Sequence, residues 1–309
     1  MTTFFDLRGI DYVLGEITID IEQDLPQFKD AIKKSGIKIV RQSKLSNVEL
    51  GVLAAEKLIS RLKINRTEIE ALIVVTQSSM RRLPGAASHI QNELRLKNEI
   101  FSFDINQGCS GFVQGMLVAV SLLSSFENVL LVTTDTYRSK LNPSDRSTNA
   151  IFSDGATASL ISRGRRFKVL SHTHLTDGSK SELLLESPSA ASSATELHMS
   201  GAEVFLWTRS VVGDLLKKFY EDLSKVRNLN FTVFSHQASG LVIEALQTKL
   251  GENAPVIKNY ESIGNTVSSS IPILISDNWE LFSENPSILI GFGVGLSLSA
   301  IAIVPNVSN

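Results

Sequence analysis

The sequence has little cysteine and no excess of charge of either sign. Cys109 is the single cysteine among 309 residues, which excludes an intrachain disulfide and agrees with a reducing compartment. Lysine and arginine number 30 and aspartate and glutamate 32, a formal net charge of −2. This balance predicts neither a nucleic-acid partner nor binding to an anionic membrane.

Long apolar runs and leader-like segments are also missing. No uncharged apolar run reaches the roughly 18 residues of a membrane span. Residues 1–16 lack the basic segment and apolar core of a signal peptide. We therefore expect a cytoplasmic protein with no membrane span. The length fits one large domain or two of about 150 residues.

Predicted strands and helices alternate along the chain. Apolar runs predict strands at 71–75, 129–133, 231–234, 256–260, 288–290 and 296–304. Periodicity and capping signals predict helices at 25–35, 46–62, 86–94, 108–123, 202–223, 240–250 and 267–275. Residues 135–149 have the composition of a surface loop, and 151–162 indicate a turn between two strands. The alternation predicts parallel sheets covered by helices, an α/β fold.

The second half of the chain repeats the first. VVTQSS at 74–79 corresponds to VFSHQAS at 233–239, DINQGC at 104–109 to ESIGNT at 261–266, and SDGATASLIS at 153–162 to FGVGLSLSAIAIV at 292–304. This internal repeat of about 150 residues predicts two related halves, 1–165 and 166–309. A pseudo-twofold axis between them would bring their corresponding turns to one site.

The centre of the first half is the strand, turn and helix at 100–123. Cys109 lies where the helix begins, and unpaired backbone N–H groups together with the helix dipole would favour its thiolate. Gly108 allows a sharp bend before it, while Gly111 and Gly115 leave one helix face open to close packing. The alternative is an inert core cysteine.

Two residues of the second half are candidates to act with Cys109. His236 and Asn265 each follow a predicted strand, at the sheet edge where ligands of parallel sheets collect. A neutral imidazole and an amide can both donate to a carbonyl or enolate oxygen. The glycines at 293–295 could present a backbone N–H to an oxyanion. A hydrogen-bonded core histidine, a plain turn asparagine and strand-end glycines are the alternatives.

These residues resemble a known family. Gly108-Cys109-Ser110-Gly111-Phe112, His236-Gln237-Ala238 and Gly264-Asn265-Thr266 are similar to the three catalytic blocks of β-ketoacyl-acyl-carrier-protein synthase III enzymes. Further similar blocks are Leu83-Pro84-Gly85-Ala86-Ala87, Asp145-Arg146, Phe152-Ser153-Asp154-Gly155-Ala156 and Phe292-Gly293-x-Gly295. The resemblance covers nearly the whole chain. It implies a thiolase-like fold, with two duplicated βαβ halves in an α-β-α-β-α layered sandwich.

The resemblance also implies a reaction. Cys109 would take an acyl group from acyl-CoA, and His236 and Asn265 would stabilise the enolate formed when a malonyl thioester loses CO2. The N–H groups of Cys109 and Gly295 would form the oxyanion hole. Substrate-binding positions would be Arg146, Leu83, Phe205 and Phe292. No metal or other cofactor is implied.

The family is dimeric, so the resemblance implies a homodimer in which the segment around Leu83 reaches the partner's acyl pocket. An acyl carrier protein is a further candidate partner. Several positions depart from the family pattern: Ser239 stands where asparagine is common, and Leu206 and Leu241 replace basic carrier-docking residues. No tryptophan lies near Phe28 to stack on adenine, and Leu83 is often aromatic in the family. These departures predict a specialised relative in fatty-acid or secondary-metabolite synthesis.

Other functions remain open. The same fold could pass the acyl group to an amine or alcohol, or serve as a non-catalytic subunit, although the trio of Cys109, His236 and Asn265 argues against the latter. A hydrolase of another fold is disfavoured because no G-x-S-x-G motif is present. His172 and His174 lack further ligands in metal-binding spacing, so we interpret them as strand or surface residues.

Overall fold

The computed structural model describes residues 3–79, 81–188 and 195–306. The strands are β1 (Thr3–Leu14), β2 (Ile17–Asp20), β3 (Ile39–Gln42), β4 (Ala71–Val75), β5 (Phe101–Ile105), β6 (Asn128–Asp135), β7 (Gly155–Thr176), β8 (Leu184–Pro188), β9 (Thr195–Met199), β10 (Thr232–Ser235), β11 (Val256–Ile257), β12 (Ser287–Gly293) and β13 (Ser297–Pro305).

The α-helices are α1 (Ile21–Asp24), α2 (Lys29–Ser35), α3 (Asn47–Leu62), α4 (Ala86–Glu93), α5 (Gly108–Leu122), α6 (Arg146–Asn149), α7 (Gly201–Trp207), α8 (Gly213–Arg227), α9 (Gly240–Leu250), α10 (Tyr260–Ile263), α11 (Ser270–Asp277) and α12 (Trp279–Glu284). Short 3-10 segments are η1 (Pro26–Phe28), η2 (Arg66–Glu68), η3 (Arg138–Lys140), η4 (Gly178–Leu183) and η6 (Val267–Ser269), and η5 (Thr208–Val212) is a π-helical turn. No helix in the described ranges is both long and apolar enough to span a membrane.

The main sheet shows the predicted duplication. Its path runs β11-β10-β12-β13-β7-β6-β4-β5, with β1 paired to β7. In the first half β4 lies parallel between β5 and β6, and in the second half β10 lies parallel between β11 and β12. The next strand, β7 or β13, is antiparallel in both halves. The predicted thiolase-like α/β fold with two duplicated halves is therefore confirmed.

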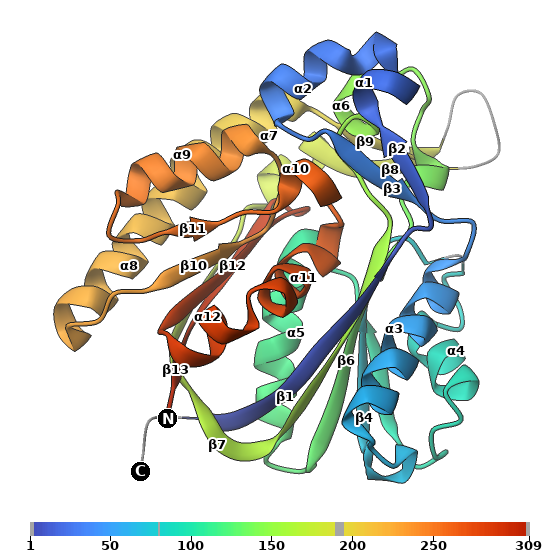
Figure 1. Ribbon diagram of the computed structural model, residues 1–309, viewed down its shortest axis with the longest axis vertical. Coiled ribbons are helices and arrows are strands. Elements are labelled where there is room, and N and C mark those ends of the chain that lie inside the picture. The colour runs from blue at the N-terminus through green and yellow to red at the C-terminus, as the bar shows by residue number, and fades with distance from the viewer. Residues whose placement is uncertain (1–2, 80, 189–194, 307–309) are drawn as a thin grey trace.

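The helices form layers around this sheet (Figure 1). The helices α5 and α11 lie in the middle, α3 and α4 lie on one side, and α8 and α9 lie on the other. Buried side chains of α5, α11 and both sheet halves make a central core, and two further clusters lie beneath the outer helices. The predicted boundary at residue 165 falls within β7, which runs unbroken through both halves of the sheet. The division into two units there stays a prediction.

The helix α5 is central because it is apolar nearly all round. Its buried side chains include Phe112, Val113 and Met116. A β-carbon on Gly111 would collide with Val75 of β4, and one on Gly115 would lie 2.9 Å from Leu131 of β6. The two glycines therefore bring the helix backbone directly against the sheet, as their spacing predicts.

Three local predictions were wrong. Residues 135–149 include the short elements η3 and α6, and Asp135 and Thr148 are fully buried, so the segment is not simply a surface loop. The strand predicted at 256–260 ends at Ile257, and Tyr260 begins α10. Residues 151–162 contain the start of a single long strand, β7, which pairs along one edge with β1 and along the other with β6.

Replacing Gly111 by alanine should destabilise the protein by about 1–3 kcal/mol, since the added methyl group overpacks the contact with Val75. In most helices the same change is favourable by about 1 kcal/mol. Gly213→Ala is the matched control, because a β-carbon there would lie 3.6 Å from the Lys249 side chain. Urea unfolding measures both. Equal stability of the two variants would contradict the packing argument.

Candidate active site

Cys109 is the second residue of α5, and its turn is built by close backbone contacts. Gly108 has φ +44°, a conformation that side chains other than glycine rarely adopt, and the Gln77 side chain occupies the space where its β-carbon would be. Cys109 itself is 6 % exposed. Glycine is thus required at the predicted bend for two reasons, the dihedral angle and the close approach of Gln77.

The strand β12 approaches the same cysteine from the second half. A β-carbon on Gly291 would lie 2.5 Å from the Cys109 carbonyl oxygen, and one on Gly293 would lie 3.3 Å from Sγ. Glycine at both positions lets the β12 backbone contact the start of α5. Gly295, the predicted oxyanion residue, lies beyond the end of β12 with φ +131°. Its role stays a prediction, and the contact with the sulfur is made by Gly293.

His236 is held against the same strand. Its backbone N–H donates to the Ile290 carbonyl at 2.8 Å, and its ring meets the Phe292 ring edge-on at 5.5 Å between centroids. The side chain is 2 % exposed, and burial lowers its pKa to about 3. The imidazole is therefore neutral at neutral pH. Burial of His236 therefore makes the folded protein less stable as the pH falls below about 6.5. Below that pH the imidazole takes up a proton in the unfolded chain but stays neutral in the folded one.

The hydroxyl of Ser270 orients this imidazole. His236 Nδ1 lies 2.7 Å from Ser270 Oγ, and which of the two atoms donates depends on the tautomer of the imidazole. A proton given by Ser270 to Nδ1 places the imidazole's own proton on Nε2. The free ring nitrogen can then donate a hydrogen bond to an oxygen atom of a substrate. Sequence reasoning missed Ser270; its place in a run of serines inside an apolar helix was the available signal.

Asn265 is fixed by both its backbone and its side chain. It forms a parallel β-bridge with Phe152, and its Oδ1 accepts the Val267 N–H at 2.9 Å. Only the oxygen can accept from an N–H, so the amide orientation is determined. Its Nδ2 donates to no other residue within the described ranges. The β-branched Val267 has φ +54°, an unfavourable conformation that the surrounding structure maintains.

A chain of contacts joins the three predicted residues. Gly293 lies against Cys109, the neighbouring Phe292 ring packs on His236, and Ser270 contacts His236 while its hydroxyl also lies 3.2 Å from the Val267 carbonyl. Val267 in turn donates to Asn265. Residues from both halves therefore surround the start of α5, as the repeat predicts.

The electrostatics of the thiol differ from the prediction. Burial raises the pKa of Cys109 well above its ordinary value, and the nearby Asp135 carboxylate raises it further. The expected preference for thiolate at the helix start was wrong for this protein, because the loss of hydration outweighs the backbone N–H groups. Before substrate arrives, the site holds a thiol and a neutral imidazole.

The predicted substrate-binding residues lie in different environments. Phe292 is buried against His236, whereas Arg146, the first residue of α6, is exposed. Leu83 is 87 % exposed, just before α4. Phe28 is buried in η1, so its ring offers no open face for stacking. His172 and His174 lie on β7 with their ring nitrogens 3.0 Å apart, in agreement with their interpretation as strand residues.

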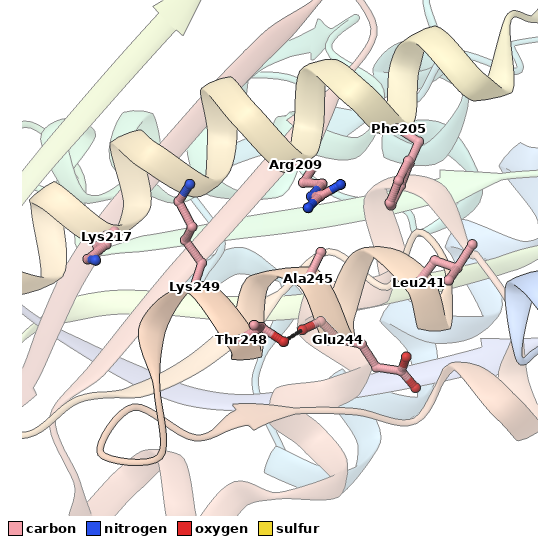
Figure 2. A pocket seen from close by; sticks show the side chains of 8 residues that line it. All are labelled: Phe205, Arg209, Lys217, Leu241, Glu244, Ala245, Thr248 and Lys249. Carbon is pink, nitrogen blue, oxygen red and sulfur yellow. Dashed lines mark hydrogen bonds between the residues drawn. The ribbon is translucent and has the colours of Figure 1, made fainter.

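Phe205 lies at one end of a surface groove between α9 and the helix formed by α7, η5 and α8 (Figure 2). Leu241 lies at the same end, Arg209 points into the middle, and Lys217 and Lys249 lie at the other end. Lys249 pairs with Asp214, and Lys217 pairs with Glu221. Leu206, beside Phe205, is 59 % exposed and Leu241 is 41 % exposed. The groove therefore combines apolar and cationic side chains with one carboxylate, Glu244.

Comparisons with known proteins agree with this geometry. Two family models match, 3-oxoacyl-[acyl-carrier-protein] synthase III at residues 103–178 and its C-terminal part at 229–304. β-Ketoacyl-[acyl-carrier-protein] synthase III of Streptococcus pneumoniae is 30 % identical over 279 residues, covering 84 % of this chain and 86 % of that protein.

Solved structures show the same fold. A 3-oxoacyl-(acyl-carrier protein) synthase from Burkholderia xenovorans superposes with a TM-score of 0.86 at 27 % identity, covering 98 % of this chain and 94 % of that one. The priming β-ketosynthase of the R1128 polyketide pathway, at 23 % identity and a TM-score of 0.86 with 98 % and 97 % covered, shares the fold. The chain therefore belongs to the 3-oxoacyl-[acyl-carrier-protein] synthase III family of condensing enzymes, which are transferases.

Proposed function

We propose that the protein joins an acyl group held on Cys109 to a malonyl thioester by decarboxylative Claisen condensation. The observation that supports this most directly is the strand β12, which lies against Cys109 through Gly293 and against His236 through Phe292. One rigid element thus holds the nucleophile and a neutral donor together. Asn265 supplies a second donor from the loop that leads to Ser270.

The reaction has two steps. In the first, the sulfur of Cys109 attacks the carbonyl carbon of an acyl-CoA, the bond to the CoA sulfur breaks, and the thiol proton passes to the departing CoA thiolate. In the second, a malonyl thioester loses CO2, and the carbon of its enolate attacks the acyl carbon on Cys109. The Cys109 thiolate leaves and takes up a proton, so the products are a 3-oxoacyl thioester and CO2.

His236 and Asn265 would act as donors to the enolate oxygen in the second step. Burial holds the imidazole neutral, and Ser270 orients it so that Nε2 can donate. The anchored amide of Asn265 leaves its Nδ2 protons available. Preorganised donors of this kind stabilise charge that develops in the transition state. The N–H groups of Cys109 and Gly295 would do the same for the acyl oxygen. We propose no metal or other cofactor beyond the two thioesters.

Intact-mass spectrometry after incubation with a panel of acyl-CoA thioesters tests this function. The parent should gain the mass of one acyl group, and Cys109→Ala should gain no mass. His236→Ala and Asn265→Ala should still be acylated, but each should lose about 10²–10³-fold in CO2 release from malonyl-CoA, because each removes one enolate donor.

The outcomes separate the candidate reactions. Absence of an adduct with every thioester would exclude both condensation and acyl transfer. An adduct that malonyl-CoA leaves intact but that amines or alcohols discharge would replace condensation by acyl transfer. Normal condensation by the His236 and Asn265 variants would refute their roles.

We propose that the groove beside Phe205 receives an acidic acyl carrier protein, and that Arg146 binds CoA. The relatives named after the acyl carrier protein favour such a partner. Arg209 makes no ion pair within the described ranges and projects into the groove, so it can supply the attraction that Leu206 and Leu241 lack.

Arg209→Glu should raise the KM for a carrier-linked malonyl substrate about tenfold, as expected for reversal of one docking charge, and leave the KM for malonyl-CoA unchanged. Arg146→Ala is the converse control and should raise the KM only for CoA thioesters, malonyl-CoA included. For the parent, the KM for the carrier-linked substrate should also rise with added salt, because salt screens the docking charges. Steady-state kinetics with both thioesters give the answer; equal effects of each variant on both substrates would contradict the assignment.

We also propose a homodimer formed through β5. This strand ends the main sheet, so one row of its backbone groups has no strand partner within the described ranges. Phe101 is half exposed; its ring stacks on Phe126 and contacts the Phe103 ring in a tilted arrangement. Pairing β5 with its copy would cover this edge and bring each exposed Leu83 towards the partner's acyl pocket. Localisation in the cytoplasm stays a prediction.

Phe103→Glu should convert the dimer into a monomer of about half the mass, because a charge at the paired edge is unfavourable. Leu53→Glu is the control for an added charge away from this edge, since the exposed Leu53 lies on α3. Sedimentation equilibrium measures the mass, and a monomeric parent or an unaltered Phe103→Glu dimer would rule out this interface.

A further inference from the structure

Asp135, the last residue of β6, is a fully buried carboxylate that makes no ion pair within the described ranges. It accepts six hydrogen bonds instead. Those to Oδ1 come from Gln77 N at 2.9 Å, Ser78 N at 3.3 Å, Ser78 Oγ at 3.3 Å and Thr76 Oγ1 at 3.4 Å. Those to Oδ2 come from Ser268 Oγ at 2.5 Å and Ser268 N at 3.4 Å.

The donors indicate that this carboxylate is anionic. Three of them are backbone N–H groups, which cannot accept a proton in return. Burying a charge without a cation costs several kcal/mol unless other donors compensate for it. Burial raises the pKa of Asp135, and the hydrogen bonds from Ser268, Gln77 and Ser78 oppose that rise. A charge maintained against this cost needs a reason other than core packing.

The two oxygens face opposite halves of the site. On the Oδ1 side, the Gln77 side chain fills the space beside Gly108, where α5 begins, and Tyr137 donates to Gln77 Oε1 at 3.4 Å. On the Oδ2 side, Ser268 lies in η6, which follows Asn265 directly and leads to Ser270. The carboxylate thus lies between the turn of the nucleophile and the loop of the two donors.

We propose that Asp135 is a positioning residue of the active site, whose carboxylate holds Gln77 at the start of α5 and Ser268 beside the Asn265 loop. It fixes the distance between the sulfur and the enolate donors. The donor part of this inference rests on the proposed condensation. A second consequence does not: the Asp135 charge adds to burial in raising the pKa of Cys109.

The charged surroundings of Asp135 are few. The titratable groups that interact with it are Cys109, Tyr137 and Asp154, and Arg138 interacts with Asp154. Burial is the larger cause of the raised Cys109 pKa and Asp135 the second. Removing the charge while keeping the shape should therefore lower the pH at which the thiol ionises without bringing it to its ordinary value.

Asp135→Asn tests the electrostatic consequence through the rate of iodoacetamide alkylation of Cys109 between pH 6 and 10. The variant should react several-fold faster than the parent at each pH below both midpoints, since removing the charge increases the fraction of thiolate. Asp11→Asn, which replaces a mostly buried carboxylate paired with Arg61, should match the parent. Coincident profiles for Asp135→Asn and the parent would overturn the proposal.

Ser268→Ala tests the positioning and remains informative if Asp135→Asn does not fold. It removes the 2.5 Å donor, so it should keep Cys109 acylation but lose about tenfold in malonyl decarboxylation at an unchanged KM for acyl-CoA. Ser159→Ala is the matched control, a buried serine whose hydroxyl has no partner in the described ranges. Equal decarboxylation by the two serine variants would overturn the positioning role.

The two failures are distinguishable. If the parent neither acylates nor decarboxylates, the proposed function is wrong, and the alkylation profiles still decide whether Asp135 controls the Cys109 thiol.

Discussion

The close approach of β12 to the start of α5 is the contact on which the site depends. Glycine at 291 and 293 brings the strand backbone against Cys109, and the same strand places Phe292 on the His236 ring. On the opposite side of α5, the glycines at 111 and 115 bring the helix backbone against β4 and β6. The helix is thus held between the two sheet halves with little freedom to move. Catalysis by positioned donors needs this rigidity.

The buried site is almost without charge. His236 is neutral because it is buried, Cys109 is held as a thiol, and Asn265 offers only an amide. Asp135 is the exception, and its charge is distributed over hydroxyl and backbone donors from both halves. A thioester and its enolate would therefore meet oriented dipoles rather than competing ions. Such an arrangement suits a reaction that moves negative charge onto oxygen.

The sequence was most informative where one residue type has a single structural use. Glycine at 108 and 111 and the buried strand 71–75 appear as predicted, and the helix predicted from residue 46 begins with a capping box of Ser46 and Glu49. Predictions from the sequence were wrong where the burial of a residue depends on segments distant in the chain. Asp135 looked like the start of a surface loop, and the Cys109 thiol looked activated, because nothing local records that η6 and β12 cover both.

The order of strands and helices and the duplication could be derived from the sequence, since periodicity and repeats can be read along the chain. The sequence also indicated Cys109, His236 and Asn265 as candidates, whose catalytic roles stay predictions. The tertiary structure alone decided the protonation of the thiol, the orientation of His236 by Ser270 and the bridging place of Asp135. The first depends on the loss of water, and the other two depend on hydrogen bonds between residues more than 30 positions apart, which only folding brings into contact.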